Sequence, residues 1–245
     1  MTDLTPWGDP IGARLPDWTA PPGPARAPLA GTDMRLDPLV AARDAHELFD
    51  AFAEDPDGRG WTYLPHGPFT ERAPFAALLR GFEASSDPLF FTIRKTGDAR
   101  AAGFASFLRI TPAAGSIEVG FIHLSPRLQR SFAATEAMHM MAAHAFDLGY
   151  RRYEWKCDAL NAPSRAAAAR LGFSYEGTFR QATLVKGRNR DTAWFAMTDH
   201  DWPAIRDAHH AWLAPDNRAP GGPDGTPRPI RSLSAMTRGL LVPPV

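Results

Sequence analysis

The chain has 245 residues, of which 44% are hydrophobic and 22% charged, a composition that excludes disordered and fibrous proteins. Lys plus Arg and Asp plus Glu each total 27, and this zero formal charge argues against a protein that binds nucleic acid through phosphates. The sequence has no long uncharged apolar span, no basic and then apolar leader, and one cysteine, Cys157. We therefore expect a cytoplasmic protein with no membrane partner, no disulfide framework and no metal site.

Proline separates the two ends of the chain from its middle. Residues 1–40 contain eight of the 24 prolines, and residues 203–245 contain another eight. Proline has no backbone N–H to donate to the hydrogen bonds of a helix or sheet. We therefore expect a Pro-rich arm over 1–31, a folded domain over 32–213 and a Pro/Gly-rich tail over 214–245. Trp7 and Trp18 leave two interpretations of the arm open. It packs across the domain or across a second subunit of a homodimer, or it is a mobile tail with incidental aromatics.

In chain order, the first half of the domain is expected to hold a strand, two helices and three further strands. The expected ranges are 33–39, then the helices 42–53 and 70–85, then the strands 88–95, 100–110 and 116–125. Leu48, Phe49 and Phe52 recur on one side of the first helix, and Thr70 is of a type that caps the second. Short turn clusters join the three later strands and predict an antiparallel meander.

The second half alternates between helices and strands. The expected ranges are the helix 131–148, the strand 151–158, the helix 161–172, the strands 173–179 and 191–198, and the helix 201–213. Asn161 is expected to cap its helix, and the last helix carries Trp202, Ile205 and Trp212. This pattern predicts an α/β (α+β) fold.

Residues 116–137 predict a strand, a short polar loop and a helix that begins near Ser131. The free N–H groups of a helix start can hold a pyrophosphate, and Arg127 and Arg130 flank that position. Ala133 and Ala134 would let a ligand approach closely, although an Ala-rich first turn is also typical of plain packing.

Four segments resemble the GNAT superfamily of N-acetyltransferases, and within it the ribosomal-protein N-terminal acetyltransferase branch. The segments are EVGFIHLSP (118–126), QRSFAATEA (129–137), NAPS (161–164) and RLGFSYEG (170–177). The resemblance covers residues 32–200 and implies a mixed, mostly antiparallel central sheet with helices on both faces. It also implies acetyl-CoA as co-substrate and transfer of its acetyl group to a primary amine of a small molecule or of a protein or peptide N-terminus.

The resemblance also implies where acetyl-CoA binds. In the family, the strand before the loop splays from its neighbour and its backbone holds the acetyl and pantetheine groups, here at Phe121, Ile122, His123 and Leu124. The implied contacts to the rest of the cofactor are Gln129, Arg130, Ser131, Phe132, Ala133, Ala134, Thr135 and Asn161. Phe132 stands where the family's loop has glycine, which adds bulk and removes backbone freedom.

The implied catalytic residues are Glu118 and Ser164. Glu118 lies on the strand before the loop, where the family places a general base, and a charge on such a strand points either to solvent or into a cleft. The family's usual tyrosine acid is replaced by Ala168, so Ser164 is the expected proton donor to the thiolate, unless it only bonds backbone in the first helical turn. Cys157 has no evident histidine partner, so a covalent cysteine mechanism is disfavoured.

The loop 58–69 is aromatic and turn-rich, and Trp61 and Tyr63 are the candidates for a wall of the acceptor site. Alternatively these side chains anchor the loop on the core. The leading function is therefore an N-acetyltransferase that works by direct transfer. Its alternatives are a non-catalytic acyl-CoA-binding or interaction module of the same fold, and an enzyme that uses longer acyl chains.

Overall fold

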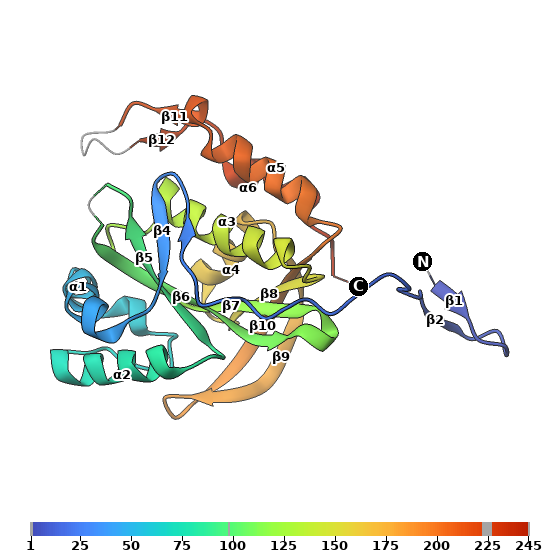
Figure 1. Cartoon of the computed structure of the whole chain (residues 1–245), viewed down its shortest axis with the longest axis horizontal. Helices are drawn as coiled ribbons and strands as arrows, with labels where there is room; N and C mark the ends of the chain where they lie inside the picture. The colour runs from blue at the N-terminus through green and yellow to red at the C-terminus, as the bar shows by residue number, and fades with distance from the viewer. Residues whose placement is uncertain (1, 98, 222–226, 245) are drawn as a thin grey trace.

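A computed structural model describes residues 2–97, 99–221 and 227–244 of the chain. It contains an eight-stranded sheet in the order β3-β4-β5-β6-β7-β8-β10-β9, with helices on both faces (Figure 1). The strands are β3 (Leu29–Ala30), β4 (Met34–Pro38), β5 (Leu89–Lys95), β6 (Ala101–Thr111), β7 (Ser116–Leu124), β8 (Arg152–Asp158), β9 (Ser174–Val185) and β10 (Arg188–Thr198). Every neighbouring pair is antiparallel except β7 and β8. The predicted fold class and the predicted meander of β5, β6 and β7 are confirmed.

The helices pack on the sheet in two groups. They are α1 (Ala41–Ala53), α2 (Arg72–Ala84), α3 (Phe132–Asp147), α4 (Ala162–Arg170), α5 (Trp202–Leu213) and α6 (Leu233–Thr237). Neighbouring strand residues point to opposite faces, so Phe90 joins the core under α1 and α2 whereas Phe91 joins the core under α3 to α5. None of the helices in the described residues is long and apolar enough to span a membrane.

Short elements occupy the connections and the two ends. They are the hairpin β1 (Thr2–Leu4) and β2 (Pro10–Gly12), the pair β11 (Arg218–Ala219) and β12 (Arg228–Pro229), and the 3-10 turns η1 (Arg59–Trp61), η2 (Pro112–Ala114), η3 (Pro215–Asn217) and η4 (Arg238–Leu240). The N-terminal hairpin projects away from the body (Figure 1). Trp7 is 85% exposed there, whereas Trp18 lies on the domain, with the Arg151 guanidinium 5.8 Å from its ring centre. At the other end, the Thr237 hydroxyl donates to the Arg170 carbonyl at 3.1 Å. Both end segments therefore contact the domain, and the division at 31 and 213 stays a prediction.

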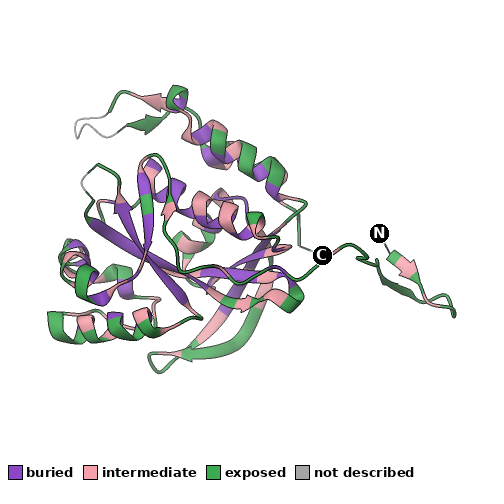
Figure 2. Cartoon of the chain, in the orientation of Figure 1, coloured by how far each residue is buried: buried purple, intermediate pink, exposed green. Residues whose placement is uncertain are grey.

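Two expected elements differ from the structure. The strands expected over 173–179 and 191–198 extend into one long hairpin, β9 and β10, closed by the two-residue turn Lys186-Gly187. The extension carries few buried side chains (Figure 2), so its sequence shows no apolar alternation. The helix expected from Thr70 begins at Arg72, and no side chain caps it.

Candidate active site

The parallel ladder between β7 and β8 opens partway along the strands. It pairs Ser116–Val119 with Arg152–Trp155 and ends there. On the other side of β7, Gly120 pairs with Ser106 and His123 with Phe104, so Phe121 and Ile122 together face a single residue of β6. This is a β-bulge, and Phe121 adopts a φ of 48°, which is uncommon for a bulky residue. The bulge bends β7 away from β8 and leaves its backbone from Phe121 to Leu124 along the gap.

The loop after β7 holds its own shape. The Leu128 and Gln129 N–H groups both donate to the Ser125 carbonyl, at 2.9 and 3.1 Å. Gln129 Nε2 donates to the Leu124 carbonyl at 2.9 Å, and Arg130 is exposed with a φ of 57°. These bonds order the loop before any ligand arrives.

The helix α3 begins at the end of this loop. Ser131 is its N-cap, and the Ser131 hydroxyl accepts from the Ala134 N–H at 3.0 Å and donates to the Leu128 carbonyl at 2.6 Å. The Thr135 hydroxyl donates to the Ser131 carbonyl at 3.3 Å. Half-buried Ala133 adds little bulk to the turn. The remaining first-turn N–H groups and the Arg130 guanidinium form a donor set that suits a pyrophosphate.

Phe132 does not fill the loop with its ring. Its side chain is 6% exposed and stacks on Trp212 of α5, with ring centres 4.3 Å apart. Only the Phe132 backbone therefore belongs to the loop surface, so the bulk that the sequence suggested as an obstacle lies elsewhere.

Glu118 lies in a buried row of charges on the sheet face that carries α1 and α2. It is 5% exposed, with Lys156 Nζ 2.9 Å from its Oε2 and Arg109 Nε 3.4 Å from the same oxygen. Burial raises the pKa of the Glu118 carboxyl, and the Lys156 ammonium opposes that rise. Lys156 also contacts Glu154 at 2.7 Å and lies 3.6 Å from the ring centre of Trp194. A carboxylate with a raised pKa at the opening of the gap has the properties of a general base.

Lys156 and Trp194 were not expected at the site. Strand alternation in the segment RRYEWKCD could have indicated Lys156, because residues two apart in a strand share a face and Lys156 must therefore lie on the same face as Glu154. The registers that place Glu154 beside Glu118 and Lys156 beside Trp194 are properties of the sheet and cannot be read from one segment.

Ser164 lies where the β7–β8 ladder ends. The indole Nε1 of Trp155, the last paired residue of β8, donates to Ser164 Oγ at 3.0 Å. The Ser164 N–H donates to Asn161 Oδ1 at 3.1 Å, so Asn161 is the N-cap of α4 as expected. The Ser164 oxygen accepts from Trp155, so its hydroxyl is free to donate, and the Cys157 sulfur is one hydrogen-bond partner within its reach. Cys157 is buried, and burial raises the pKa of its thiol, which does not favour a nucleophilic thiolate.

The loop after α1 closes over this end of the sheet. The Trp61 side chain is 5% exposed and packs against Phe52, Phe69 and Phe75, so it anchors the loop on the core. The Tyr63 hydroxyl donates to the Leu160 carbonyl at 3.2 Å, which joins the loop to the connection before α4. A role of either side chain in acceptor binding stays a prediction.

The side chain of His123 lies in the same aromatic core. It stacks on Phe52 with ring centres 3.9 Å apart, and burial lowers its pKa to about 3. Simple strand alternation would point this side chain away from Glu118, but the bulge at Phe121 and Ile122 shifts the alternation and places the neutral, enclosed imidazole on the α1 and α2 face, as Glu118 is. Only the His123 backbone borders the gap.

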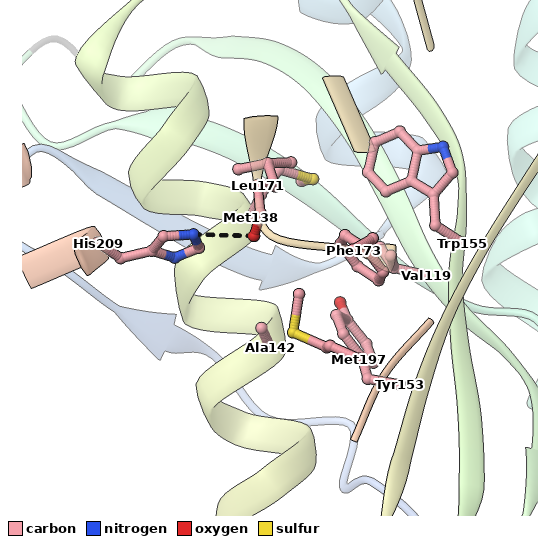
Figure 3. Close-up of a pocket in the computed structure, with 9 residues that line it drawn as sticks. All are labelled: Val119, Met138, Ala142, Tyr153, Trp155, Leu171, Phe173, Met197 and His209. Atoms are coloured by element: carbon pink, nitrogen blue, oxygen red, sulfur yellow. Dashed lines mark hydrogen bonds between the residues drawn. The ribbon is translucent and has the colours of Figure 1, made fainter. Parts of the chain in front are cut away.

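One cavity in the described residues lies on the α3 side of the sheet, beside Trp155 and on the face opposite Glu118. It has a volume of about 10 Å³ and lies between α3, α5 and the sheet (Figure 3). Its lining includes Met138, Tyr153 and Phe173. A space of this size holds one water at most, so it is a packing void and not a substrate pocket.

Comparisons with known proteins agree with this geometry. A family model described as an acetyltransferase (GNAT) domain matches residues 33–174. A GCN5-related N-acetyltransferase from Brucella melitensis is 43% identical, with coverage of 91% of this chain and 100% of its own and a TM-score of 0.86. A probable GNAT-family acetyltransferase from Chromobacterium violaceum is 40% identical, with coverage of 82% and 100% and a TM-score of 0.75.

A more distant likeness shows the fold alone. The microcin C7 self-immunity acetyltransferase MccE, solved with acetyl-CoA and AMP, is 20% identical over 69% of this chain and 93% of its own, with a TM-score of 0.60. No curated protein matches the chain. The family match covers more than half of the sequence, and the predicted family is confirmed. The chain therefore belongs to the GNAT acetyltransferases, enzymes that transfer the acetyl group of acetyl-CoA to an amine.

Proposed function

We propose that Glu118 is the general base and Ser164 the proton donor of this acetyl transfer. The observation that supports the proposal most is the opening between β7 and β8, because Glu118 lies just before it on one strand and Ser164 is bonded to the last paired residue of the other. Acetyl-CoA supplies an activated thioester, and the chain's own residues orient it and move the protons.

The backbone from Phe121 to Leu124 would hold the acetyl and pantetheine groups along the gap. The loop from Gln129 to Ser131 and the free first-turn N–H groups of Phe132 and Ala133 would hold the pyrophosphate. Ala134, whose N–H donates to the Ser131 hydroxyl, would allow its close approach. Thr135 acts through the Ser131 carbonyl, to which its hydroxyl donates. Asn161 acts through the start of α4, which it caps.

Glu118 would take a proton from the incoming amine, which leaves the nitrogen lone pair free to attack the thioester carbonyl. Ser164 would then give its hydroxyl proton to the departing thiolate and recover one from the attacking nitrogen, so that the products are a neutral amide and a thiol. Glu118 would release its proton to solvent. The acceptor is a primary amine, of a small molecule or of a protein N-terminus, that approaches beside Tyr63 and the loop 58–69.

Mutation of Glu118 with a matched control tests the base. Glu118→Gln should lower kcat/KM by about 10²- to 10⁴-fold in an amine panel with a thiol readout, because a positioned base contributes that much. Calorimetric titration should show the same acetyl-CoA affinity as the unchanged chain. Glu154→Gln is the control, because Glu154 is the register partner of Glu118 and also contacts Lys156. A loss of less than about threefold for Glu118→Gln would exclude Glu118 as the base.

Mutation of Ser164 tests the acid. Ser164→Ala should lower kcat and leave acetyl-CoA affinity unchanged, because the hydroxyl acts on the leaving group. An unchanged kcat would show that Ser164 is not the proton donor and has only a structural role, through its hydrogen bonds to Trp155 and Asn161.

We also propose a cytoplasmic enzyme whose acetyltransferase domain spans 32–213. The single cysteine supports the reducing compartment. A homodimer is proposed on the exposed apolar side chains of the N-terminal hairpin, Leu4 and Trp7. Sedimentation of the full chain and of a chain that begins at residue 14 would test it, because only the full chain should dimerise.

A further inference from the structure

Four side chains from four elements form one continuous stack at the start of α3. Phe132 and Trp212 lie at its centre, with ring centres 4.3 Å apart and ring planes inclined by 26°. The Arg170 guanidinium of α4 covers the outer face of Trp212, and the Arg218 guanidinium of β11 covers that of Phe132, each 4.8 Å from a ring centre. Cation–π contacts of this kind are strongest where water is excluded, and both rings are buried.

The two arginines of the stack, Arg170 and Arg218, are each linked to α3 by polar contacts. Arg170 Nη2 donates to Thr135 Oγ1 at 3.0 Å, and Thr135 in turn bonds the carbonyl of the N-cap Ser131. Arg218 Nη2 lies 2.6 Å from Asp33 Oδ2, and the Asp33 N–H donates to Glu136 Oε2 at 2.8 Å. The first turn of α3 is therefore held from two sides by groups outside its own loop.

Phe132 is the residue at which the stack meets the loop. Its ring is clamped by Trp212, and its own N–H is one of the free donors of the helix start. Because Phe132 is the first helical residue, packing that fixes its ring against Trp212 also fixes its Cα, and loss of that packing would let the backbone of the first turn and its donors shift.

We propose that the Phe132–Trp212 stack is a positioning device through which the C-terminal helix α5 sets the orientation of the pyrophosphate-binding turn. The inference rests on the proposed acetyl-CoA site. It also explains Phe132, which stands where the family's loop has glycine. In this chain the packing of the Phe132 ring would fix the conformation of the loop, whereas glycine would leave the loop flexible. Trp212 is thus a positioning residue that acts on the cofactor through Phe132.

A pair of matched substitutions on α5 tests the proposal. Trp212→Leu breaks the stack at the start of α3. Trp202→Leu removes an equally buried tryptophan of α5 that stacks on Phe146 near the end of α3, at 5.0 Å. Each full-length variant is titrated calorimetrically with acetyl-CoA and with free ADP, which has the pyrophosphate without pantetheine, and its melting temperature is recorded.

The expected result separates positioning from stability. Both variants should melt at lower temperature, but only Trp212→Leu should bind acetyl-CoA and ADP about tenfold more weakly, the loss of about one charge-assisted hydrogen bond. Trp212→Phe, which keeps a ring in the stack, should restore most of the affinity. If Trp212→Leu does not fold, Phe132→Leu carries the same test, because it keeps an apolar side chain in place and removes the ring.

Contrary results fall into two distinguishable kinds. Equal losses of affinity in the two Trp→Leu variants, or no loss in Trp212→Leu, would overturn the positioning role and leave the acetyl-CoA site standing. If the unchanged chain binds acetyl-CoA but not ADP, the pyrophosphate is not held at this turn, and the proposed site fails together with the inference.

Discussion

At the scale of single residues, the site depends on a row of alternating charges across three strands. Glu118 contacts Lys156 at 2.9 Å, Lys156 contacts Glu154 at 2.7 Å, and Glu154 contacts Arg152 at 2.6 Å. Arg152 in turn pairs with Glu176 of β9. Each buried charge of the row lies beside an opposite charge, and Lys156 is the neighbour that most opposes the rise that burial causes in the pKa of Glu118.

Lys156→Met should therefore move the pH dependence of the reaction. The loss of the ammonium removes the charge that favours ionised Glu118, so the pKa of Glu118 rises further and the acid limb of kcat/KM shifts to higher pH by about one unit. Methionine keeps an apolar stem over Trp194. Arg152→Met is the control: it removes the ion pair between Arg152 and Glu154 without touching Glu118, so the acid limb of kcat/KM should stay at the same pH. If the acid limb of kcat/KM lies at the same pH in the unchanged chain and in both variants, ionisation of Glu118 does not control the rate.

The core contains a hydroxyl that finds no partner among the described residues. Tyr153 is 1% exposed, its hydroxyl makes no hydrogen bond there, and its ring lines the small cavity of Figure 3. An unpaired buried hydroxyl costs stability, so Tyr153→Phe should raise the free energy of unfolding by up to about 1 kcal/mol. Tyr175→Phe should lower it by about 1 kcal/mol, because the Tyr175 hydroxyl bonds Thr178 Oγ1 at 2.8 Å. Urea unfolding measures both, and destabilisation by Tyr153→Phe would mean that a buried water satisfies this hydroxyl.

At the scale of elements, sequence periodicity predicted the parts that bury one face. The expected helix 131–148 corresponds to α3, and the expected strand 116–125 to β7, because apolar side chains mark one side of each. Of the two predicted caps, Asn161 accepts a backbone N–H and Thr70 caps no helix. Ser131, predicted only as the approximate start of its helix, is also a cap. The outer half of β9 and β10 was missed because hydrogen bonds and a two-residue turn form it, and most of its side chains remain in solvent.

The turn of that hairpin contains an unfavourable residue with a structural use. Lys186 and Gly187 have φ values of 50° and 73°, the type I′ geometry in which Asn-Gly is preferred. Lys186 Nζ nevertheless donates to the Trp61 carbonyl at 2.8 Å and so ties the hairpin to the loop over the acceptor end. The lysine therefore serves the contact between the two segments and not the turn itself.

Lys186→Asn should separate these two effects. The turn becomes more favourable, so the melting temperature should stay the same or rise slightly. The tie to Trp61 is lost, so chymotrypsin should cleave within residues 58–69 severalfold faster, and KM for the acceptor should rise. Lys186→Arg, which keeps a long cationic donor, should behave like the unchanged chain. Unchanged cleavage in Lys186→Asn would show that the loop is held by its aromatic anchors alone.

At the scale of the whole molecule, contacts between residues distant in sequence determine the roles of Phe132 and Trp61, which the local motifs did not settle. Phe132 looked like a defect of the loop because its partner, Trp212, lies on the last long helix. Trp61 looked like a possible wall of the acceptor site, and its burial follows from the packing of α1, α2 and β6 around it. The motif, its order along the chain and its carboxylate were predictable from the sequence. The charged neighbours of Glu118 depend on strand register and were not.

The docking of α5 on α3 contains a second long-range contact, between two neutral histidines. His139 Nδ1 lies 3.2 Å from His209 Nδ1, and His209 Nε2 lies 3.0 Å from the Leu171 carbonyl (Figure 3). If His209 Nε2–H donates to Leu171, His209 Nδ1 is an acceptor and His139 supplies the proton between the two rings. Burial, with the nearby His210 and with Arg206 or Arg170, lowers the pKa of His139 to about 4 and that of His209 to about 3.

This pair makes acid stability a property of the α3–α5 contact. The unfolded chain gains protons on histidine below pH 6.5, whereas the folded chain does not until about pH 4. The free energy of unfolding is therefore highest above pH 6.5 and falls by about 1.4 kcal/mol per pH unit for each buried histidine as the pH drops. His123, with a pKa of about 3, adds a third contribution of the same sign. Carboxylates whose pKa is lowered, such as Asp44, lose their stabilisation only in more acidic solution.

Urea unfolding at pH 7.0 and pH 5.5 isolates the share of the pair. His209→Gln keeps an N–H donor for the Leu171 carbonyl but cannot titrate, so its loss of stability between the two pH values should be about 1 kcal/mol smaller than that of the unchanged chain. His200→Gln is the control, since the His200 side chain is 92% exposed, and it should lose as much as the unchanged chain. An equal loss in His209→Gln would mean that α5 stays docked on protonated histidines. A smaller loss would place the acid sensitivity of the fold at the helix that also holds Trp212 against the start of α3.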